Sequence, residues 1–554
     1  MGLRVGTVGR RSRRAGAVVL AAALGMLAPG VSPFTVGAPA ALAQERQPWM
    51  PPAPSGGPPG DNGGKPDQEY VQQTECVASN QARNKELVLK NQPWGQMHLR
   101  LDEVHNYVGA KQGSIGGGIK VAVIDTGVTP HPFLDGRLEG GGDYVAGEDG
   151  LEDCDGHGTQ VAGIIAAKVT DPSAAFRGVA PDARIVSIRQ SSQVFRPKSD
   201  QEKASEKQAA ESKKALEDAE REAREAEERA EQAEREAQER DNEEPGGGGT
   251  GAGATSPGQD KGPRVQESAE AAGNLHTLAQ AVVRAADTPG VKVINMSVDS
   301  CRPGGGPMTS KEKELQSAVH YAVGKKDVVV VAAAGNTSNV CQQNTQANPD
   351  NPTTVVTPPW FSEDLLAVAA IDENGGVAPF SMHGPWVSVA APGTKIISLD
   401  PAKGSNQLAN LTFEGGEPTD IKGTSFAAPY VAGLAVLVRQ LHPDLDARQV
   451  MERIMATAQH PGSRSGRDQF VGHGVINPMA ALTATVPSEI GVAPATDIAL
   501  PSDMPPPNPP DTTPLVVALA GSGGAVAALG LTLFIVHTIR RNRPGYQPQR
   551  RESA

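Results

Sequence analysis

The sequence predicts an α/β fold in which a parallel β-sheet is covered by helices on both faces. Five apolar runs lack the polar alternation of a half-exposed strand: IKVAVID, ARIVSIR, VKVINMSV, DVVVVAAAG and LLAVAAI. Strands of this kind are typical of sheets buried on both sides. The runs alternate with segments of helical pattern such as GTQVAGIIAAK, and this alternation is typical of parallel sheets. It occupies residues 119–192 and resumes over 270–485, so an insertion interrupts the domain.

The first 43 residues have the pattern of an export signal. Arginines at positions 10, 11, 13 and 14 precede an apolar run over residues 15–28, and the small residues of Ala-Leu-Ala at 41–43 offer a cleavage site. Residues 44–95 are first rich in proline and glycine and then polar, which predicts an extended N-terminal arm without a core of its own. The α/β domain then covers residues 96–486.

An insertion at residues 197–264 separates the two halves of the α/β pattern. Its stretch from 200 to 244 holds 18 acidic and 9 basic side chains and almost no large apolar residue, a composition that favours a helix with many charge pairs. One stripe of this helix consists of Ala215, Ala219, Ala223, Ala226, Ala230, Ala233 and Ala237. We expect a solvated single helix followed by a glycine-rich linker, and a partner-binding coiled coil is the alternative.

The C-terminal part predicts a membrane anchor. Residues 487–514 contain nine prolines and predict a semi-rigid stalk. The next 22 residues, 515–536, carry no formal charge and are long enough as a helix to cross a hydrocarbon core of about 30 Å. Arginines follow at 540, 541, 543, 550 and 551. By the positive-inside rule we expect a transmembrane helix over 515–539, a cytoplasmic tail over 540–554 and an extracytoplasmic main domain, with a buried hydrophobic helix as the alternative.

Charge and cysteine content narrow the class of protein further. The net charge of −12 does not suggest a nucleic-acid partner, and −9 of it lies in residues 200–244. The cysteines fit an oxidising exterior and allow three disulfide pairings: they are Cys76, Cys154, Cys301 and Cys341. No two of them have the C-x-x-C spacing of a zinc site, so we expect no metal.

Three short segments of the α/β domain carry candidate catalytic side chains. VAVIDTGV ends an apolar strand at Asp125, DGHGTQVAG places His157 at the start of a helix, and GTSFAAPYVAG supplies Ser425. A serine nucleophile needs a base to take its proton, and that base needs a carboxylate to fix its tautomer and stabilise its charge. Taken singly, each residue has an ordinary structural interpretation, and Ser425 fits a helix cap. Their order Asp–His–Ser, with the surrounding sequence, favours a catalytic triad.

These segments resemble the subtilisin-like serine proteases. Further strings of the same family pattern follow in the expected order, over about residues 119–192 and 270–485: GVAPDARIVSIR, VINMS, AAAGN, AAPG and GHGVINPMAAL. The resemblance implies a subtilisin-like fold and peptide-bond hydrolysis without a cofactor. It also implies that Asn336, in AAAGN, donates its side-chain amide to the developing oxyanion together with the backbone N–H of Ser425.

The sequence departs from that family at one wall of the predicted substrate cleft. After VINMS the family usually has two glycines, whereas this chain continues with Val298, Asp299, Ser300 and Cys301. A side chain at Asp299 would narrow this wall or give it a charge. We therefore expect restricted rather than broad peptide specificity.

The order of the predicted segments resembles the mycosins, the membrane-anchored subtilisin-like proteases of actinobacterial type VII secretion systems. PWGQMHLRLDEVH and the cysteine in DCDGHGT fit that group. The resemblance implies that the arm wraps the catalytic domain, that Cys76 bonds to Cys154, and that Cys301 bonds to Cys341. It further implies polypeptide substrates and association with the secretion membrane complex, with a chiefly structural role in that complex as the alternative function.

Overall fold

The computed structural model describes residues 47–77, 91–170, 174–238, 271–344, 350–414, 417–463, 465–491 and 512–542. The predicted export signal lies outside these residues, as do parts of the arm, the glycine-rich linker, the stalk and the tail. The chain divides into two compact units, residues 1–486 and residues 487–554, and each is described by itself.

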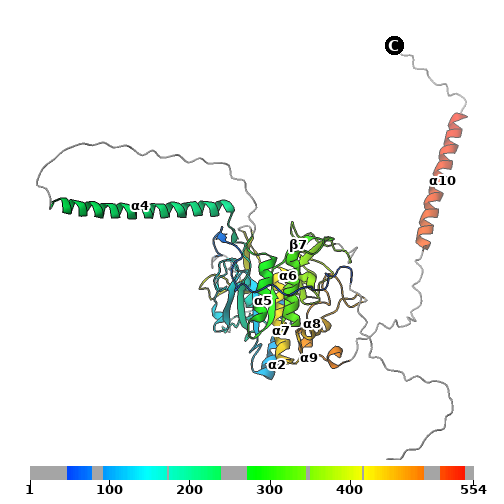
Figure 1. Cartoon of the computed structure of the whole chain (residues 1–554). Coiled ribbons are helices and arrows are strands. Elements are labelled where there is room, and N and C mark those ends of the chain that lie inside the picture. The colour runs from blue at the N-terminus through cyan, green and yellow to red at the C-terminus, as the bar shows by residue number, and fades with distance from the viewer. Residues whose placement is uncertain are drawn as a thin grey trace, which may run out of the picture. The chain divides into compact units, whose positions relative to one another are not determined.

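A parallel sheet of seven strands forms the centre of the first unit (Figure 1). Its strand order is β11-β10-β8-β6-β2-β4-β3, and every neighbouring pair is parallel. The strands are β2 (Lys120–Asp125), β3 (Leu138–Asp143), β4 (Arg184–Arg189), β6 (Val291–Met296), β8 (Val329–Ala333), β10 (Leu366–Ile371) and β11 (Val389–Pro392). The predicted parallel α/β fold is confirmed, and the five apolar runs correspond to β2, β4, β6, β8 and β10. The sequence did not predict β3 and β11.

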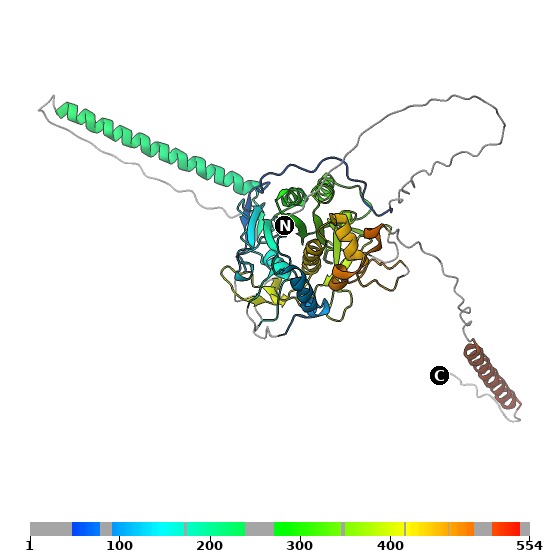
Figure 2. The same ribbon diagram turned by 90° about the horizontal axis from the view of Figure 1, so that it is seen from below.

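Helices cover both faces of this sheet (Figure 2). Helices α3 (His157–Ala166) and α7 (Thr424–Leu441) contact each other on one face, whereas α5 (Leu275–Asp287) and α6 (Ser310–Gly324) contact each other on the other. Helix α7 is buried from Thr424 to Arg439 because small residues let the sheet and α3 approach it closely. Besides the long helix of the insertion, the remaining described helices of this unit are α1 (Trp94–His98), α2 (Leu101–Gln112), α8 (Ala447–Ala456) and α9 (Pro478–Thr483), with 3₁₀ turns at Pro132–Leu134 and Pro359–Phe361.

Short two-stranded sheets surround the central one. They pair β7 (Ser300–Pro303) with β9 (Thr354–Thr357), β12 (Ser398–Leu399) with β13 (Leu408–Ala409), and β14 (Leu411–Glu414) with β15 (Glu417–Asp420). The disulfide between Cys301 and Cys341 lies at β7.

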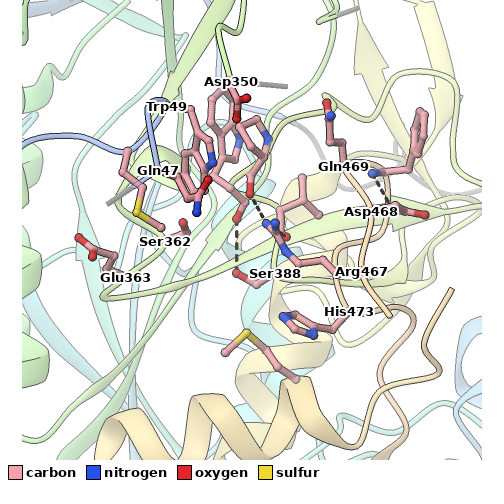
Figure 3. Close-up of a pocket in the computed structure, with 16 residues that line it drawn as sticks. Gln47, Trp49, Asp350, Ser362, Glu363, Ser388, Arg467, Asp468, Gln469 and His473 are labelled. Atoms are coloured by element: carbon pink, nitrogen blue, oxygen red, sulfur yellow. Dashed lines mark hydrogen bonds between the residues drawn. The ribbon is translucent and has the colours of Figure 1, made fainter. Parts of the chain in front are cut away.

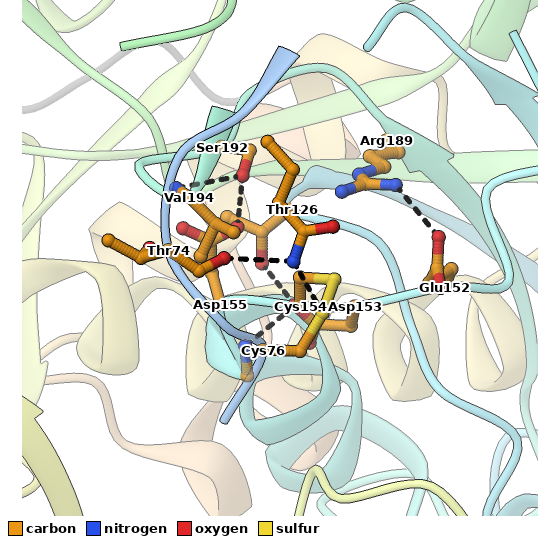
Figure 4. Close-up of a disulfide and its surroundings, with 12 residues drawn as sticks. Thr74, Cys76, Thr126, Glu152, Asp153, Cys154, Asp155, Arg189, Ser192 and Val194 are labelled. Carbon is orange, nitrogen blue, oxygen red and sulfur yellow. Dashed lines mark hydrogen bonds and ion pairs between the residues drawn. A yellow bond between two sulfur atoms is a disulfide. The ribbon is translucent and has the colours of Figure 1, made fainter. Parts of the chain in front are cut away.

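The N-terminal arm lies along the catalytic domain in its described part. Its strand β1 (Tyr70–Gln72) pairs antiparallel with β5 (Phe195–Pro197). The indole of Trp360 donates to the carbonyl of Trp49 at 2.7 Å. Within the arm, Cys76 is bonded to Cys154 (Figure 4). These contacts hold the arm at several separate points.

The charged insertion forms the long helix α4 (Asp200–Gln238), in agreement with the helix expected from its composition. Ser199 and Glu202 form a capping box at its start, and Arg196 pairs with Glu202 through both guanidinium NH groups. Almost all described side chains of α4 are exposed, including those of the alanine stripe from Ala215 to Ala233. Ion pairs one helical turn apart, such as Arg235 with Glu231 at 2.9 Å, follow its surface.

The second unit contains the apolar helix α10 (Thr513–Arg541). An 18-residue stretch of this helix has a mean hydropathy of 1.9, and its 29 residues are enough to cross a membrane. A 3₁₀ turn at Pro487–Ile490 is the other described element of this unit.

Candidate active site

The structure brings Asp125, His157 and Ser425 together at the carboxyl edge of the sheet. Asp125 is the last residue of β2, His157 is the first residue of α3, and Ser425 is the second residue of α7. Asp125 Oδ1 accepts a hydrogen bond from His157 Nδ1 at 2.7 Å, and Ser425 Oγ lies 2.9 Å from His157 Nε2. Proton transfer needs heavy-atom distances of about 2.6–3.2 Å, and both distances lie in that range.

Backbone geometry at the start of α7 presents the serine hydroxyl to the histidine. The N-cap residue Gly423 has φ 151°, and an added Cβ there would lie 2.9 Å from Ser425 Oγ, so a larger residue would press on the hydroxyl. The hydroxyl of Ser425 contacts the imidazole instead of capping the helix. The positive end of the helix dipole lies beside it.

Burial and charge act in opposite directions on His157. Burial tends to lower the pKa of its imidazole, whereas the charge and hydrogen bond of Asp125, aided by Asp153 and Asp155, raise it. The acidic neighbours prevail, so the pKa of His157 is raised above the ordinary value of 6.5. Asp125 itself is 0% exposed, which keeps solvent from weakening its interaction with the imidazole.

Asp153 supports this arrangement, and the sequence analysis did not single it out. Its buried carboxylate accepts hydrogen bonds from the hydroxyl of Thr126 at 2.8 Å, from the backbone N–H of Gly156 at 2.8 Å and from Thr159. Burial raises the pKa of Asp153 to about 6, although these hydrogen bonds oppose the rise. Asp153 therefore joins the end of β2 to the start of α3, and so fixes Asp125 relative to His157.

Asn336 lies beside the serine with its amide in a defined orientation. Its Oδ1 accepts from the backbone N–H and the hydroxyl of Thr424, at 3.0 and 3.2 Å. The Nδ2 amide hydrogens are therefore left for another acceptor. Ser297, a further residue that the sequence analysis did not identify, donates to the carbonyl of Ser425 at 2.8 Å and holds the start of α7.

These residues line a cleft of about 740 Å³. Besides Asp125, His157, Asn336 and Ser425, its lining includes Asp155, Asp299, Lys311 and Lys422. The cleft has a recess beside Ser425. Residues 297–300 form one wall of this recess, and Ala333 and Asn336 lie on the other. Among the described residues, no group of three or more His, Cys, Asp or Glu side chains is placed to hold a metal ion.

A disulfide lies close to the histidine (Figure 4). Cys154, bonded to Cys76 of the arm, is three residues before His157. Next to it, Asp155 accepts from the hydroxyl of Ser192 at 2.5 Å and from the backbone N–H of Gln193 at 2.7 Å. The arm is thus covalently joined to the loop that carries His157.

A second cavity, of about 820 Å³, contains none of these residues (Figure 3). Trp49 of the arm, Trp386, Arg467 and His473 are among its lining residues. Burial, aided by Arg467 and His460, lowers the pKa of His473 to about 4, so this imidazole is neutral at pH 7. Among the described residues, no side-chain hydrogen bond joins His473 to a serine. The Asp–His–Ser arrangement therefore lies in the smaller cleft and not in this cavity.

Comparison with known proteins agrees with the geometry of this cleft. The model of the subtilase family, peptidase family S8, matches residues 116–474. The chain belongs to the subtilase family. It is therefore a serine endopeptidase of the subtilisin type.

The relatives of this subtilase place it among the mycosins. Mycosin-1 of Mycolicibacterium smegmatis is 34% identical over 501 residues, which cover 88% of this chain and 92% of the relative. Mycosin-3 of Mycobacterium tuberculosis is 38% identical over 456 residues, covering 79% and 83%. The crystal structure of MycP1 from Mycobacterium smegmatis aligns with a TM-score of 0.58 at 33% identity, over 80% of this chain and 97% of that one. A chain in an intact ESX-5 inner membrane complex aligns with a TM-score of 0.58 at 34% identity, over 89% and 98%.

The raised pKa of His157 predicts the pH dependence of this subtilase. A general base must be neutral, so kcat/KM should rise with pH as the imidazole loses its proton, with its midpoint above 6.5. Hydrolysis of a fluorogenic peptide between pH 5 and pH 9 measures this midpoint. A midpoint below 6.5 would mean that burial, not Asp125, dominates the pKa of the base.

Proposed function

We propose that this subtilase uses Asp125, His157 and Ser425 as its catalytic triad, outside the cytoplasm, in a type VII secretion system. The observation that carries the proposal is the continuous chain of hydrogen bonds from Asp125 through His157 to Ser425 in one cleft. His157 Nε2 takes the proton of Ser425 Oγ as the oxygen attacks the scissile carbonyl carbon. Asp125 stays ionised and holds the Nδ1–H of the imidazolium.

The same groups complete the reaction. The carbonyl oxygen becomes an oxyanion, which Asn336 Nδ2 and the backbone N–H of Ser425 stabilise. His157 then gives its proton to the leaving amine, and the bond between carbonyl carbon and nitrogen breaks. A water molecule, deprotonated by His157, hydrolyses the acyl-enzyme and restores Ser425.

Helix α10 anchors the protease in a membrane, and its flanking charge supports one orientation. Arginines at 540, 541, 543, 550 and 551 follow the apolar span. Because positive residues favour the cytoplasmic side, the tail 540–554 is cytoplasmic and the peptidase domain 96–486 is extracytoplasmic. The disulfides of that domain agree with an oxidising exterior.

The proposed association with a type VII secretion system rests on the relatives. MycP1, a solved relative, is described as part of the ESX-1 type VII secretion system, and another aligned chain belongs to the ESX-5 inner membrane complex. By this likeness the chain associates with a type VII membrane complex and cleaves secreted polypeptides. In this proposal the arm, residues 44–95, supports the peptidase fold, because Cys76 joins it to Cys154.

A second candidate function is structural, in which the peptidase domain stabilises the membrane complex and proteolysis is secondary. The presence of a relative inside the intact ESX-5 complex favours it. The structural function is compatible with an intact catalytic cleft, because one chain can both stabilise a complex and cleave substrates.

Complementation of a deletion strain separates these functions. Under the main proposal, wild-type protein restores both secretion and processing of type VII substrates, Ser425→Ala restores neither fully, and a chain lacking α10 restores neither. The amounts of secreted and processed substrate in the medium are measured. Full secretion by Ser425→Ala, with none from the chain lacking α10, would instead support the structural function. Restored secretion and processing by the chain lacking α10 would contradict the proposed membrane anchoring.

A further inference from the structure

The recess beside Ser425 is formed by the segments that follow two neighbouring strands. β6 and β8 are adjacent and parallel, with Met296 opposite Ala332. Residues 297–300 and 333–336 therefore leave the sheet side by side, and members of both segments line the cavity that contains Ser425. This recess adjoins the oxyanion donor Asn336.

The carboxylate of Asp299 reaches from one wall of the recess to the other. An ideal Cβ on Gly335 would lie 2.9 Å from Asp299 Oδ2, so the carboxylate rests against the backbone of the opposite wall. It accepts a hydrogen bond from the backbone N–H of Asn336. The position of Asp299 is fixed from both sides, because β6 precedes it and Cys301, bonded to Cys341, follows it in β7.

This carboxylate has no cationic side chain as a partner within the described part of the chain. Asp299 is exposed in the cleft, and the protein packed around its carboxyl raises the pKa of that group above the ordinary value. The hydrogen bond from Asn336 and the nearby His157 oppose that rise. Removing water from a carboxylate when a substrate binds costs free energy unless a cation replaces the water. Lys311 and Lys422 also line the cleft and are exposed like Asp299, but among the described residues neither forms an ion pair with it.

The position of the recess identifies which substrate side chain enters it. The scissile carbonyl carbon must lie next to Ser425 Oγ, with its oxygen toward Asn336 Nδ2. The residue that carries this carbonyl has its Cα one bond away, so its side chain projects into the recess that adjoins both groups. That residue is on the acyl side of the scissile bond.

We propose that Asp299 is a specificity residue that selects lysine or arginine on the acyl side of the scissile bond. This inference rests on the proposed roles of Ser425 and Asn336. It also explains why this chain departs from the two glycines that the family usually has here. Glycine has no side chain, whereas Asp299 supplies a fixed negative charge at this place. The alternative is that Asp299 only narrows the recess, which would favour small residues.

The test uses detergent-solubilised full chain and fluorogenic peptides that differ only in the acyl-side residue: lysine, arginine, norleucine or alanine. Norleucine has nearly the length of lysine without its charge. A charge-assisted hydrogen bond to a carboxylate that the bound peptide covers predicts a kcat/KM about 10- to 100-fold higher for lysine than for norleucine. In Asp299→Asn this ratio should fall to about one through loss of activity on lysine, while activity on norleucine changes little.

Asp444→Asn is the matched control. Asp444 is exposed in the loop after α7, and this 18-residue helix puts about 27 Å between its two ends, so the variant loses the same charge far from the cleft. The ratio of lysine to norleucine should keep its wild-type value. A second variant, Asp299→Gly, restores the common family residue and opens the recess.

Three results would overturn the inference. The first is a wild-type ratio of lysine to norleucine near one, and the second is a ratio that Asp299→Asn leaves unchanged. The third is a preference for alanine that only Asp299→Gly relieves, which would mean that Asp299 selects substrates by size. Fluorophosphonate labelling of the same samples distinguishes failure of this inference from failure of the proposed function. Labelled Ser425 without a lysine preference refutes only the selection by Asp299. Absence of labelling in folded protein refutes the serine mechanism itself. Labelling also reports that each Asp299 variant has folded.

Discussion

Ser425→Ala, His157→Ala and the double variant should each lose about 10⁶-fold in kcat, with no further loss in the double variant. The reason is that the serine is a nucleophile only while the imidazole 2.9 Å away accepts its proton. Once either residue is absent, the other contributes nothing to this step. Substrate binding should change little, because both residues lie at the reacting bond rather than along the peptide. Steady-state hydrolysis by the purified full chain, with active sites counted in the wild type, measures these losses.

The control for this series is a substitution that leaves the triad in place. Arg467→Lys changes a residue of the 820 Å³ cavity, which contains none of the triad residues, and it should retain wild-type kcat if folding is preserved. Thermal unfolding of every variant checks the fold. Losses from the two single alanine substitutions that multiply in the double variant would contradict a mechanism in which Ser425 and His157 act as one unit.

Asn336→Leu should lower kcat by about 10²- to 10³-fold and leave KM nearly unchanged. The amide nitrogen of Asn336 is oriented by the hydrogen bonds that its oxygen accepts from Thr424, so it is ready to bind charge that appears only in the transition state. Leucine has a similar volume but no donor. Separate determination of kcat and KM with one peptide distinguishes this effect from loss of binding.

Thr424→Ala provides the graded comparison. It removes the hydroxyl that donates to Asn336 Oδ1 at 3.2 Å and accepts from the backbone N–H of Gly335 at 3.2 Å, but keeps the backbone N–H of Thr424 that donates to Asn336 Oδ1 at 3.0 Å. Loss of one such neutral hydrogen bond is worth about 1 kcal/mol, so the fall in kcat should be about fivefold. A rise in KM with unchanged kcat in Asn336→Leu would show that Asn336 binds the ground state and is not part of an oxyanion hole.

The strands that the sequence predicted share one physical property, which β3 lacks, whereas β11 (VAAP) is apolar and buried like them but only four residues long. β2, β4, β6, β8 and β10 are continuous apolar runs because both of their faces are covered. β3 contains three consecutive glycines, a composition that disfavours strands. The structure gives the reason for Gly141: an added Cβ would lie 2.7 Å from side-chain atoms of Ile188 and Val186. Close packing against β4 therefore selects glycine there, and no local pattern in the sequence reveals it.

The candidate site was predicted where its chemistry depends on residue type and order, and missed where it depends on tertiary contacts. Asp125 ends an apolar run, whereas His157 and Ser425 lie at the starts of largely apolar helices, which makes all three visible in the sequence. Asp153 looks like an ordinary loop carboxylate. Its function depends on its hydrogen bonds to Thr126 and Thr159, which only the packing of α3 against β2 creates.

The central claim is that Ser425 is the nucleophile and that His157 activates it. Mass spectrometry of the full chain after treatment with a fluorophosphonate, followed by peptide mapping, tests this most directly. We predict one adduct, on Ser425, in the wild-type protein and none in folded His157→Ala. An adduct on a different residue, or an unmodified Ser425 in correctly folded wild-type protein, would contradict the account.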